Sequence, residues 1–183
     1  MIRRGAAVAA LLLLAAAPAG AQPVPEPDGY RTEDYRAPVP ETLAGARVLT
    51  TEEAHAIWTE GGAAFVDVLP RAPKPANLPA GTIWREPARL SIPGAIWLPN
   101  VGYGALAEVN HAYFRAGLEK ATGGDPGRPL VFFCLMDCWM SWNAARRAQD
   151  YGYPNVMWLP DGTDGWDLAD YPLEAVEPEP GGR

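Results

Sequence analysis

The strongest constraint in the sequence is the stretch of residues 129–147, where a short apolar run leads into a loop and then an amphipathic segment. The apolar run at residues 130–133 follows a Gly and a Pro, which is typical of a short buried strand. From residue 141, small and charged residues follow helical spacing as far as Gly152, a candidate helix end. The stretch predicts a strand, a tight loop and a helix, and both cysteines of the chain, Cys134 and Cys138, lie in the loop.

This location suits a reactive thiol. A cysteine between the end of a strand and the start of a helix lies where backbone N–H groups and the helix dipole favour negative charge. Such surroundings lower the pKa of a thiol and make its thiolate a nucleophile. A disulfide across so few residues closes too small a loop to stabilise the fold much. We therefore interpret the pair as chemical, the alternative being two inert, buried apolar cysteines.

Residues 1–21 have the pattern of a secretory signal peptide. Arg3 and Arg4 precede an apolar run, and small residues follow it as far as Ala21. The run is shorter than the roughly 20 residues of a membrane-spanning helix. We expect cleavage before Gln22 and an exported, periplasmic protein with no membrane contact afterwards; a retained N-terminal anchor is the alternative.

The net charge excludes one class of partner. It is −7 for the whole chain and two units more negative without Arg3 and Arg4. Binding to phosphate groups needs a basic face, so we expect no nucleic-acid partner. Residues 22–183 are enough for one domain with a core of its own.

The mature part divides into three expected segments. Residues 22–45 are rich in Pro and Tyr, which predicts an extended arm that packs in part against the domain. Residues 46–173 form the domain, and residues 174–183 are expected to be an acidic flexible tail. Within the domain, the irregular, Pro-rich residues 69–90 are expected to form an ordered flap.

Strands and helices alternate along the domain. Thr50 and Glu53 form a capping box that opens a helix, and a buried strand ends at Asp67. A helix at residues 105–121, a strand at 155–159 and a turn with an aromatic plug at 161–166 are also expected. The alternation predicts an α/β domain with a mainly parallel central sheet flanked by helices. The two histidines of the chain, His55 and His111, are interpreted as structural.

Several segments resemble the rhodanese-like domain family, in order along residues 46–173. They are Val66-Asp67-Val68; Ser91-Ile-Pro-Gly-Ala-Ile-Trp-Leu-Pro99, similar to "HIPGAINLP" with Ser91 in place of His; Phe133-Cys134; Tyr151-Gly-Tyr-Pro-Asn-Val156; and Gly162 to Trp166. A narrower resemblance, carried by Tyr30-Arg31, Tyr35 to Pro40 and Cys134-x-x-Asp-Cys138-Trp, is to the PQQ-dependent catabolism-associated CXXCW motif proteins. That resemblance implies a periplasmic pathway of alcohol oxidation by quinoprotein dehydrogenases.

The resemblance implies a sulfurtransferase-like site. In such a site Cys134 would be the nucleophile that holds a sulfur as a persulfide. The second cysteine of this chain, four residues on, suggests a different use, and we expect Cys138 to be the resolving thiol. The loop amides would cradle an anion, with Trp139 closing the rim, Ser141 starting the helix and Asp67 ordering a nearby loop. The cradle residues are Leu135, Met136, Asp137, Trp139, Met140 and Ser141.

The loop departs from the family in its charge. Trp139 or Met140 stands at the usual basic position, and Asp137 would oppose a dianion such as thiosulfate. Phosphatase chemistry is excluded because no terminal arginine is present to hold phosphoryl oxygens.

Thiol redox chemistry or sulfur transfer by Cys134 and Cys138 is the function expected, as an accessory to PQQ-dependent alcohol catabolism and with no required cofactor. The alternative is a non-catalytic module that binds Cu(I) through the same cysteines, or a quinone cofactor, or a partner. Candidate partners are a periplasmic quinoprotein dehydrogenase and a thiol or sulfur donor.

Overall fold

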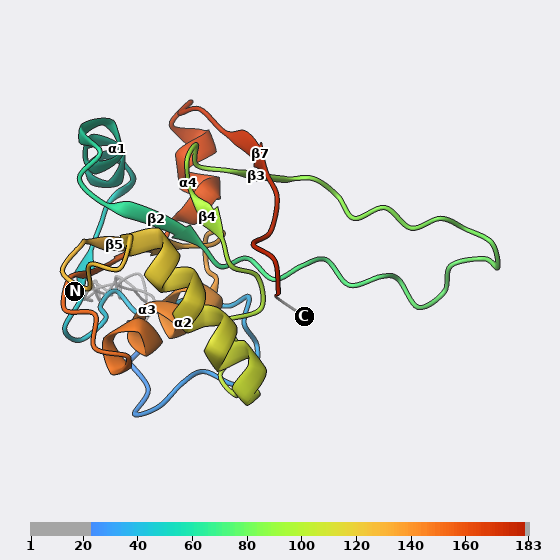
Figure 1. The fold of residues 1–183 in the computed structure, drawn as a ribbon, viewed down its shortest axis with the longest axis horizontal. Coiled ribbons are helices and arrows are strands. Elements are labelled where there is room, and N and C mark those ends of the chain that lie inside the picture. Colours follow the sequence, from blue (N-terminus) through green and yellow to red (C-terminus); the bar gives the residue numbers. More distant parts are fainter. Residues whose placement is uncertain (1–22, 182–183) are drawn as a thin grey trace, which may run out of the picture.

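The computed structural model describes residues 23–181, so the expected signal peptide lies outside the described residues. The centre of the fold is a five-stranded sheet in which every neighbouring pair is parallel (Figure 1). In spatial order its strands are β1 (Arg47–Val48), β6 (Val156–Leu159), β5 (Leu130–Phe133), β2 (Ala64–Asp67) and β4 (Ile96–Trp97). This confirms the predicted α/β class.

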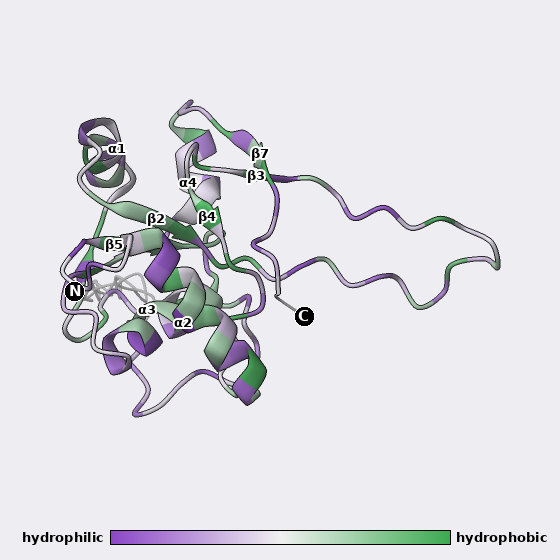
Figure 2. Ribbon diagram, viewed as in Figure 1, coloured by the Kyte–Doolittle hydropathy of each residue, from purple (hydrophilic) through white to green (hydrophobic). Residues whose placement is uncertain are grey.

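Helices cover both faces of the sheet, as a parallel sheet requires. The four are α1 (Thr51–Glu60), α2 (Glu108–Thr122), α3 (Trp139–Asp150) and α4 (Gly162–Leu168). Apolar residues of α2 and α3 pack in one core cluster, and those of α1 and α4 pack in a second. Figure 2 shows the central strands mostly green and the outer helix faces marked by purple. Among the described residues, no helix is long and apolar enough to cross a bilayer.

Local signals in the sequence account for the ends of α1. The Thr50 side chain accepts from the Glu53 N–H, the Glu53 carboxylate accepts from the Thr50 N–H, and the helix ends at Gly61 with φ 68°. The capping box is confirmed. The start of α3 differs from the expectation, because the helix begins at Trp139 and not at Ser141, with Cys138 as its extended N-cap residue.

Two further expectations were wrong. Residues 161–166 were expected to be a turn, but Gly162–Leu168 forms α4, with Trp166 buried. The tail was expected to be flexible, yet β7 (Glu174–Val176) pairs antiparallel with β3 (Arg89–Ser91). Beyond β7, the Glu179 N–H donates to the Trp97 carbonyl at the edge of the main sheet. Strand pairing satisfies the backbone N–H and C=O groups of this tail, which its acidic, Pro- and Gly-rich composition suggested were solvated.

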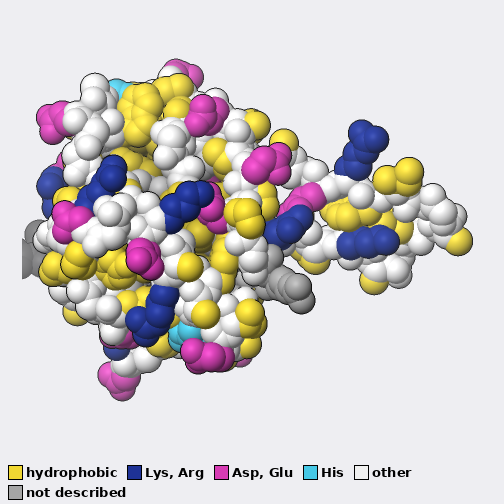
Figure 3. Space-filling model, in the orientation of Figure 1, with side chains coloured by type: hydrophobic (Ala, Val, Ile, Leu, Met, Phe, Trp, Pro, Cys, Tyr) yellow, Lys and Arg dark blue, Asp and Glu magenta, His cyan; other side chains and the backbone are white. Residues whose placement is uncertain are grey.

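Residues 69–88 have no regular structure and project away from the body (Figure 1). The apolar side chain of Ile83 in this segment is 81% exposed. Arg71 and Glu86 form an ion pair between the two branches near the base. Figure 3 shows Lys and Arg side chains along this projection, which carries Arg71, Lys74 and Arg85.

The N-terminal arm is extended and packs against the domain, as predicted. Its Val24, Tyr35, Ala37 and Val39 are half-buried against the core cluster that contains α2 and α3. Both histidines also pack: His55 stacks on Tyr171, and His111 hydrogen bonds to Tyr151.

Arg147 on α3 is a buried cation that holds the loop after β4. It is 1% exposed, and its guanidinium donates to the carbonyls of Val101, Tyr103 and Gly104 at 2.8–3.0 Å. The guanidinium carbon of Arg147 lies 4.1 Å from the centre of the Tyr30 ring. Burial lowers the pKa of Arg147. The residue thus joins α3, this loop and the arm.

Replacing Arg147 by Met should lower the free energy of unfolding by about 2–4 kcal/mol, because buried carbonyls lose their donors. The matched control is Arg146→Met on the same helix, where the lost bonds are partly solvated and the cost should stay below about 1 kcal/mol. Urea denaturation measures both. Equal small losses would show that Arg147 does not hold the loop.

Candidate active site

The two cysteines are joined in a disulfide at the carboxyl end of β5. Their Cα atoms are 6.2 Å apart, within the range that a disulfide spans. Cys134 is fully buried and Cys138 is 2% exposed. The structure therefore brings together the two residues expected to carry the chemistry, but it encloses them.

The backbone of Cys134 is held by three donors. Its carbonyl accepts from the Thr163 N–H at 3.0 Å, from the Thr163 hydroxyl at 3.3 Å and from Arg89 Nη2 at 3.3 Å. Thr163 belongs to the first turn of α4, which follows the neighbouring strand β6. The end of β5 is consequently fixed from two sides before the loop begins.

Arg89 is itself fixed by Asp67, which ends β2. Arg89 Nε donates to Asp67 Oδ2 at 2.7 Å, and the Ser91 hydroxyl donates to the same oxygen at 2.6 Å. The Leu69 N–H donates to Asp67 Oδ1, so Asp67 orders the chain after β2. Burial raises the pKa of Asp67, and the charge of Arg89 and these three hydrogen bonds oppose that rise.

Three of the expected cradle amides have protein acceptors in the disulfide form. The Met136 N–H donates to Asp164 Oδ2, the Trp139 N–H to the Tyr35 carbonyl and the Ser141 N–H to the Cys138 carbonyl. These groups are not free to bind an anion in this state. An anion cradle therefore stays a prediction for a rearranged, reduced loop.

The other loop residues have distinct places. Asp137 is exposed with φ 52°, a left-handed conformation. Trp139 is 2% exposed beneath the arm and does not form an open rim. The Ser141 hydroxyl donates to the Cys138 carbonyl and accepts from Trp158 Nε1, so it braces the first turn of α3. Met140 is buried beside them.

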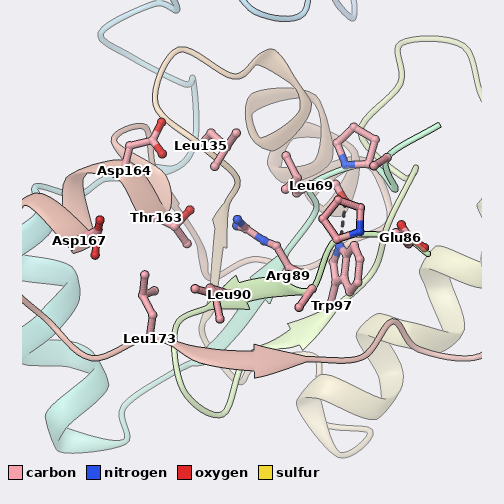
Figure 4. A pocket seen from close by; sticks show the side chains of 14 residues that line it. Leu69, Glu86, Arg89, Leu90, Trp97, Leu135, Thr163, Asp164, Asp167 and Leu173 are labelled. Carbon is pink, nitrogen blue, oxygen red and sulfur yellow. Dashed lines mark hydrogen bonds between the residues drawn. The ribbon is translucent and has the colours of Figure 1, made fainter. Parts of the chain in front are cut away.

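A cleft of about 390 Å³ opens beside the loop, at the carboxyl ends of β2, β5 and β6 (Figure 4). Arg89 points into it between Leu135 and Thr163, and Asp164 and Asp167 stand on one side. Because the charge of Arg89 is balanced by Asp67, these two aspartates leave the cleft acidic. A dianion would be repelled, as the charge of Asp137 had suggested.

Arg89 and Thr163 are site residues that sequence reasoning missed. The signal for Arg89 was indirect: a buried aspartate at the end of a strand needs a cation, and no basic residue lies in the cysteine loop. Arg89 comes from β3, 45 positions before Cys134. Nothing in the local sequence marks Thr163, whose role depends on α4 meeting β5.

The family model of the rhodanese-like domain matches residues 50–169. The chain belongs to the rhodanese-like domain family. The rhodanese-like domain thus includes β2 with its terminal aspartate, the cysteine loop after β5, and α3. Among curated proteins, no sequence relative matches this chain.

Solved structures similar to this rhodanese-like domain include three sulfur-transfer proteins. A thiosulfate sulfurtransferase from Pseudomonas aeruginosa is 22% identical (TM-score 0.49), with 73% of this chain and 21% of that chain covered. A polysulfide-sulfur transferase from Wolinella succinogenes is 17% identical (TM-score 0.45), with 73% of this chain and 82% of that chain covered. A human single-domain sulfurtransferase is 22% identical (TM-score 0.41), with 67% of this chain and 96% of that chain covered. The chain spans about a fifth of the Pseudomonas protein.

Replacing Arg89 by Met should lower the free energy of unfolding by about 3–5 kcal/mol, because Asp67 is left as an unpaired buried charge. The double variant Asp67→Asn with Arg89→Met should lose less, since no charge is stranded. Urea denaturation of the four proteins gives the coupling. A double variant as unstable as the sum of the single ones would show that the pair is not coupled.

Gly162 sets the approach of α4 to the cysteine. Its φ is 53°, and a Cβ there would lie 2.5 Å from the Cys134 carbonyl oxygen. Gly162→Ala should therefore cost about 3 kcal/mol or more of unfolding free energy. Gly123→Ala is the control, because φ is 65° and no atom lies within 4 Å, so only the left-handed backbone is penalised, by about 1 kcal/mol. Equal losses would exclude the close contact as the cause.

Proposed function

We propose that this protein is a rhodanese-family enzyme that takes a sulfur atom onto Cys134 and releases it by forming the Cys134–Cys138 disulfide. The observation that carries the proposal is the bonded cysteine pair between β5 and the start of α3 in a rhodanese-like domain. Helix N-termini favour thiolates, so the reduced pair has a site suited to nucleophilic chemistry.

The chemistry balances in three steps. The Cys134 thiolate attacks a sulfane sulfur, and the donor leaves with the electron pair of the broken bond, giving a persulfide. The Cys138 thiolate attacks Cys134 Sγ and displaces hydrosulfide, which leaves the disulfide. A dithiol reductant then supplies two electrons, is itself oxidised to a disulfide, and restores both thiols.

The charge of the site supports a sulfur donor of low charge. Asp164 and Asp167 line the cleft, Asp137 lies on the loop, and Arg89 is neutralised by Asp67. An organic persulfide suits these surroundings better than thiosulfate. The similar solved structures of a thiosulfate sulfurtransferase and a polysulfide-sulfur transferase do not assign a donor here.

The wider setting of the proposal comes from the sequence. The signal-like residues 1–21 support export to the periplasm, and the CXXCW resemblance supports an accessory role in PQQ-dependent alcohol catabolism, with a quinoprotein dehydrogenase or a sulfur donor as partner. The chemistry above requires no cofactor. Cell fractionation tests the location: the protein should be released with the periplasmic contents, shortened by its leader.

Intact-mass spectrometry of the reduced protein with an organic persulfide tests the reaction. Cys138→Ser should retain one added sulfur on Cys134, because no thiol resolves the persulfide. The unaltered protein should return to the disulfide and release one hydrosulfide per chain, and Cys134→Ser should do neither.

Absence of added sulfur on the Cys138→Ser variant would overturn sulfur transfer and leave a redox pair. A native mass that gains copper in place of sulfur would favour the second candidate, a Cu(I) module that uses the reduced cysteines. A retained quinone would favour a cofactor-binding module.

A further inference from the structure

The N-terminal arm lies along one face of α3 that donates hydrogen bonds to it. Positions 139, 142, 143 and 146 follow the spacing of a single helix face. Trp139 Nε1 donates to the Pro38 carbonyl, and Trp142 Nε1 donates to the Thr42 carbonyl, each at 3.1 Å. The indoles therefore hold the arm at two points of its main chain.

The polar residues of the same face add four more bonds. Asn143 Nδ2 donates to the Arg31 carbonyl at 2.8 Å, while Asn143 Oδ1 accepts from the Arg31 N–H at 2.9 Å. The Arg146 guanidinium donates to the carbonyls of Pro27 and Asp28. The acceptors on the arm in these bonds are backbone oxygens, so an extended main chain of another sequence can accept the same bonds.

The arm also pairs directly with the cysteine loop. Arg36 and Cys138 form an antiparallel bridge, and the Tyr35 carbonyl accepts from the Trp139 N–H at 2.9 Å. The Trp139 N–H is one of the free donors at the start of a helix that could otherwise hydrogen bond to an anion or a thiolate. The half-buried Ala37 packs on the core cluster that contains both cysteines. The arm thus forms part of the cover over the disulfide.

Thiol–disulfide exchange requires a thiolate to reach a sulfur atom. Here both sulfurs belong to residues that are at most 2% exposed. Of the two, Cys138 pairs with Arg36 of the arm, whereas Cys134 directly follows β5. A thiol that approaches along the course of the arm meets Cys138 first.

We propose that the reductant of this disulfide is a protein dithiol that binds as an extended segment on the α3 face, in the place of the arm, and attacks Cys138. Its thiolate forms a mixed disulfide with Cys138 Sγ, and the bond to Cys134 breaks with its electron pair on Cys134. The second thiol of the reductant then displaces Cys138. This rests on the proposed function and names the partner of its last step, and it leaves Cys134 as a free thiolate for the next sulfur.

Undocking the arm in the full chain tests access. Ala37→Asp places a charge on the buried side of the arm, and Thr32→Asp makes the same charge change at an exposed arm position. The rate of disulfide reduction is measured with a thioredoxin and with dithiothreitol. Ala37→Asp should raise both rates by about tenfold or more, because burial of an unpaired charge favours arm release, and Thr32→Asp should leave them within about twofold.

Hydrogen exchange separates arm release from general unfolding. In Ala37→Asp the Trp139 amide, bonded to the arm, should lose protection while the Phe132 amide in β5 keeps it. Val39→Asp repeats the test at a second half-buried arm position if Ala37→Asp does not fold. An exposed Trp139 amide with an unchanged reduction rate would overturn the proposal.

Trapping identifies the sulfur that is attacked. A thioredoxin without its resolving cysteine should form a mixed disulfide at Cys138 of the Ala37→Asp protein, as read by peptide mapping. A mixed disulfide at Cys134 would overturn the proposed approach. These readouts start from the disulfide and use no sulfur donor, so they can succeed or fail independently of persulfide formation on Cys134.

Discussion

The site depends on the buried ion pair between Asp67 and Arg89. Asp67 ends β2, Arg89 begins β3, and the guanidinium reaches the Cys134 carbonyl at the end of β5. One charged pair thus ties together three chain segments that are distant in sequence. A buried pair of this kind tolerates little displacement, because loss of either partner strands a charge in the interior. The position of the reactive cysteine follows from that constraint.

The second determinant is the enclosure of the cysteine pair. On one side the cleft with Arg89 and Thr163 supports the Cys134 backbone, and on the other the arm and the indole of Trp139 cover the loop. The thiol chemistry is therefore separated from bulk water in the disulfide state. Exclusion of small thiols would let a protein-sized partner decide when the pair is reduced, which is the role that we propose for the α3 face.

Charge distinguishes this loop from one built for a dianion. The loop itself offers Asp137 and no cation, and the nearby Arg89 is already balanced. Rhodanese-like architecture supplies a helix N-terminus and a cysteine at a strand end, while the surrounding residues select the substrate. In the function that we propose, the second cysteine of this loop, Cys138, gives the sulfur on Cys134 an intramolecular route of release.

Local sequence patterns determined the buried strand at residues 130–133, the capping box of α1, the extended arm and the cysteine loop, because hydrophobic periodicity, caps and prolines act within a few residues. Tertiary structure decided what those patterns could not specify. The partner of Asp67 is 22 positions away, α4 formed where a turn was expected, and β7 became ordered by pairing with β3. The arm covers the disulfide because donors on α3 meet its carbonyls more than 100 positions away. Such contacts form only when segments distant in sequence meet in the folded chain, and the local sequence of one segment does not specify which other segment it will contact.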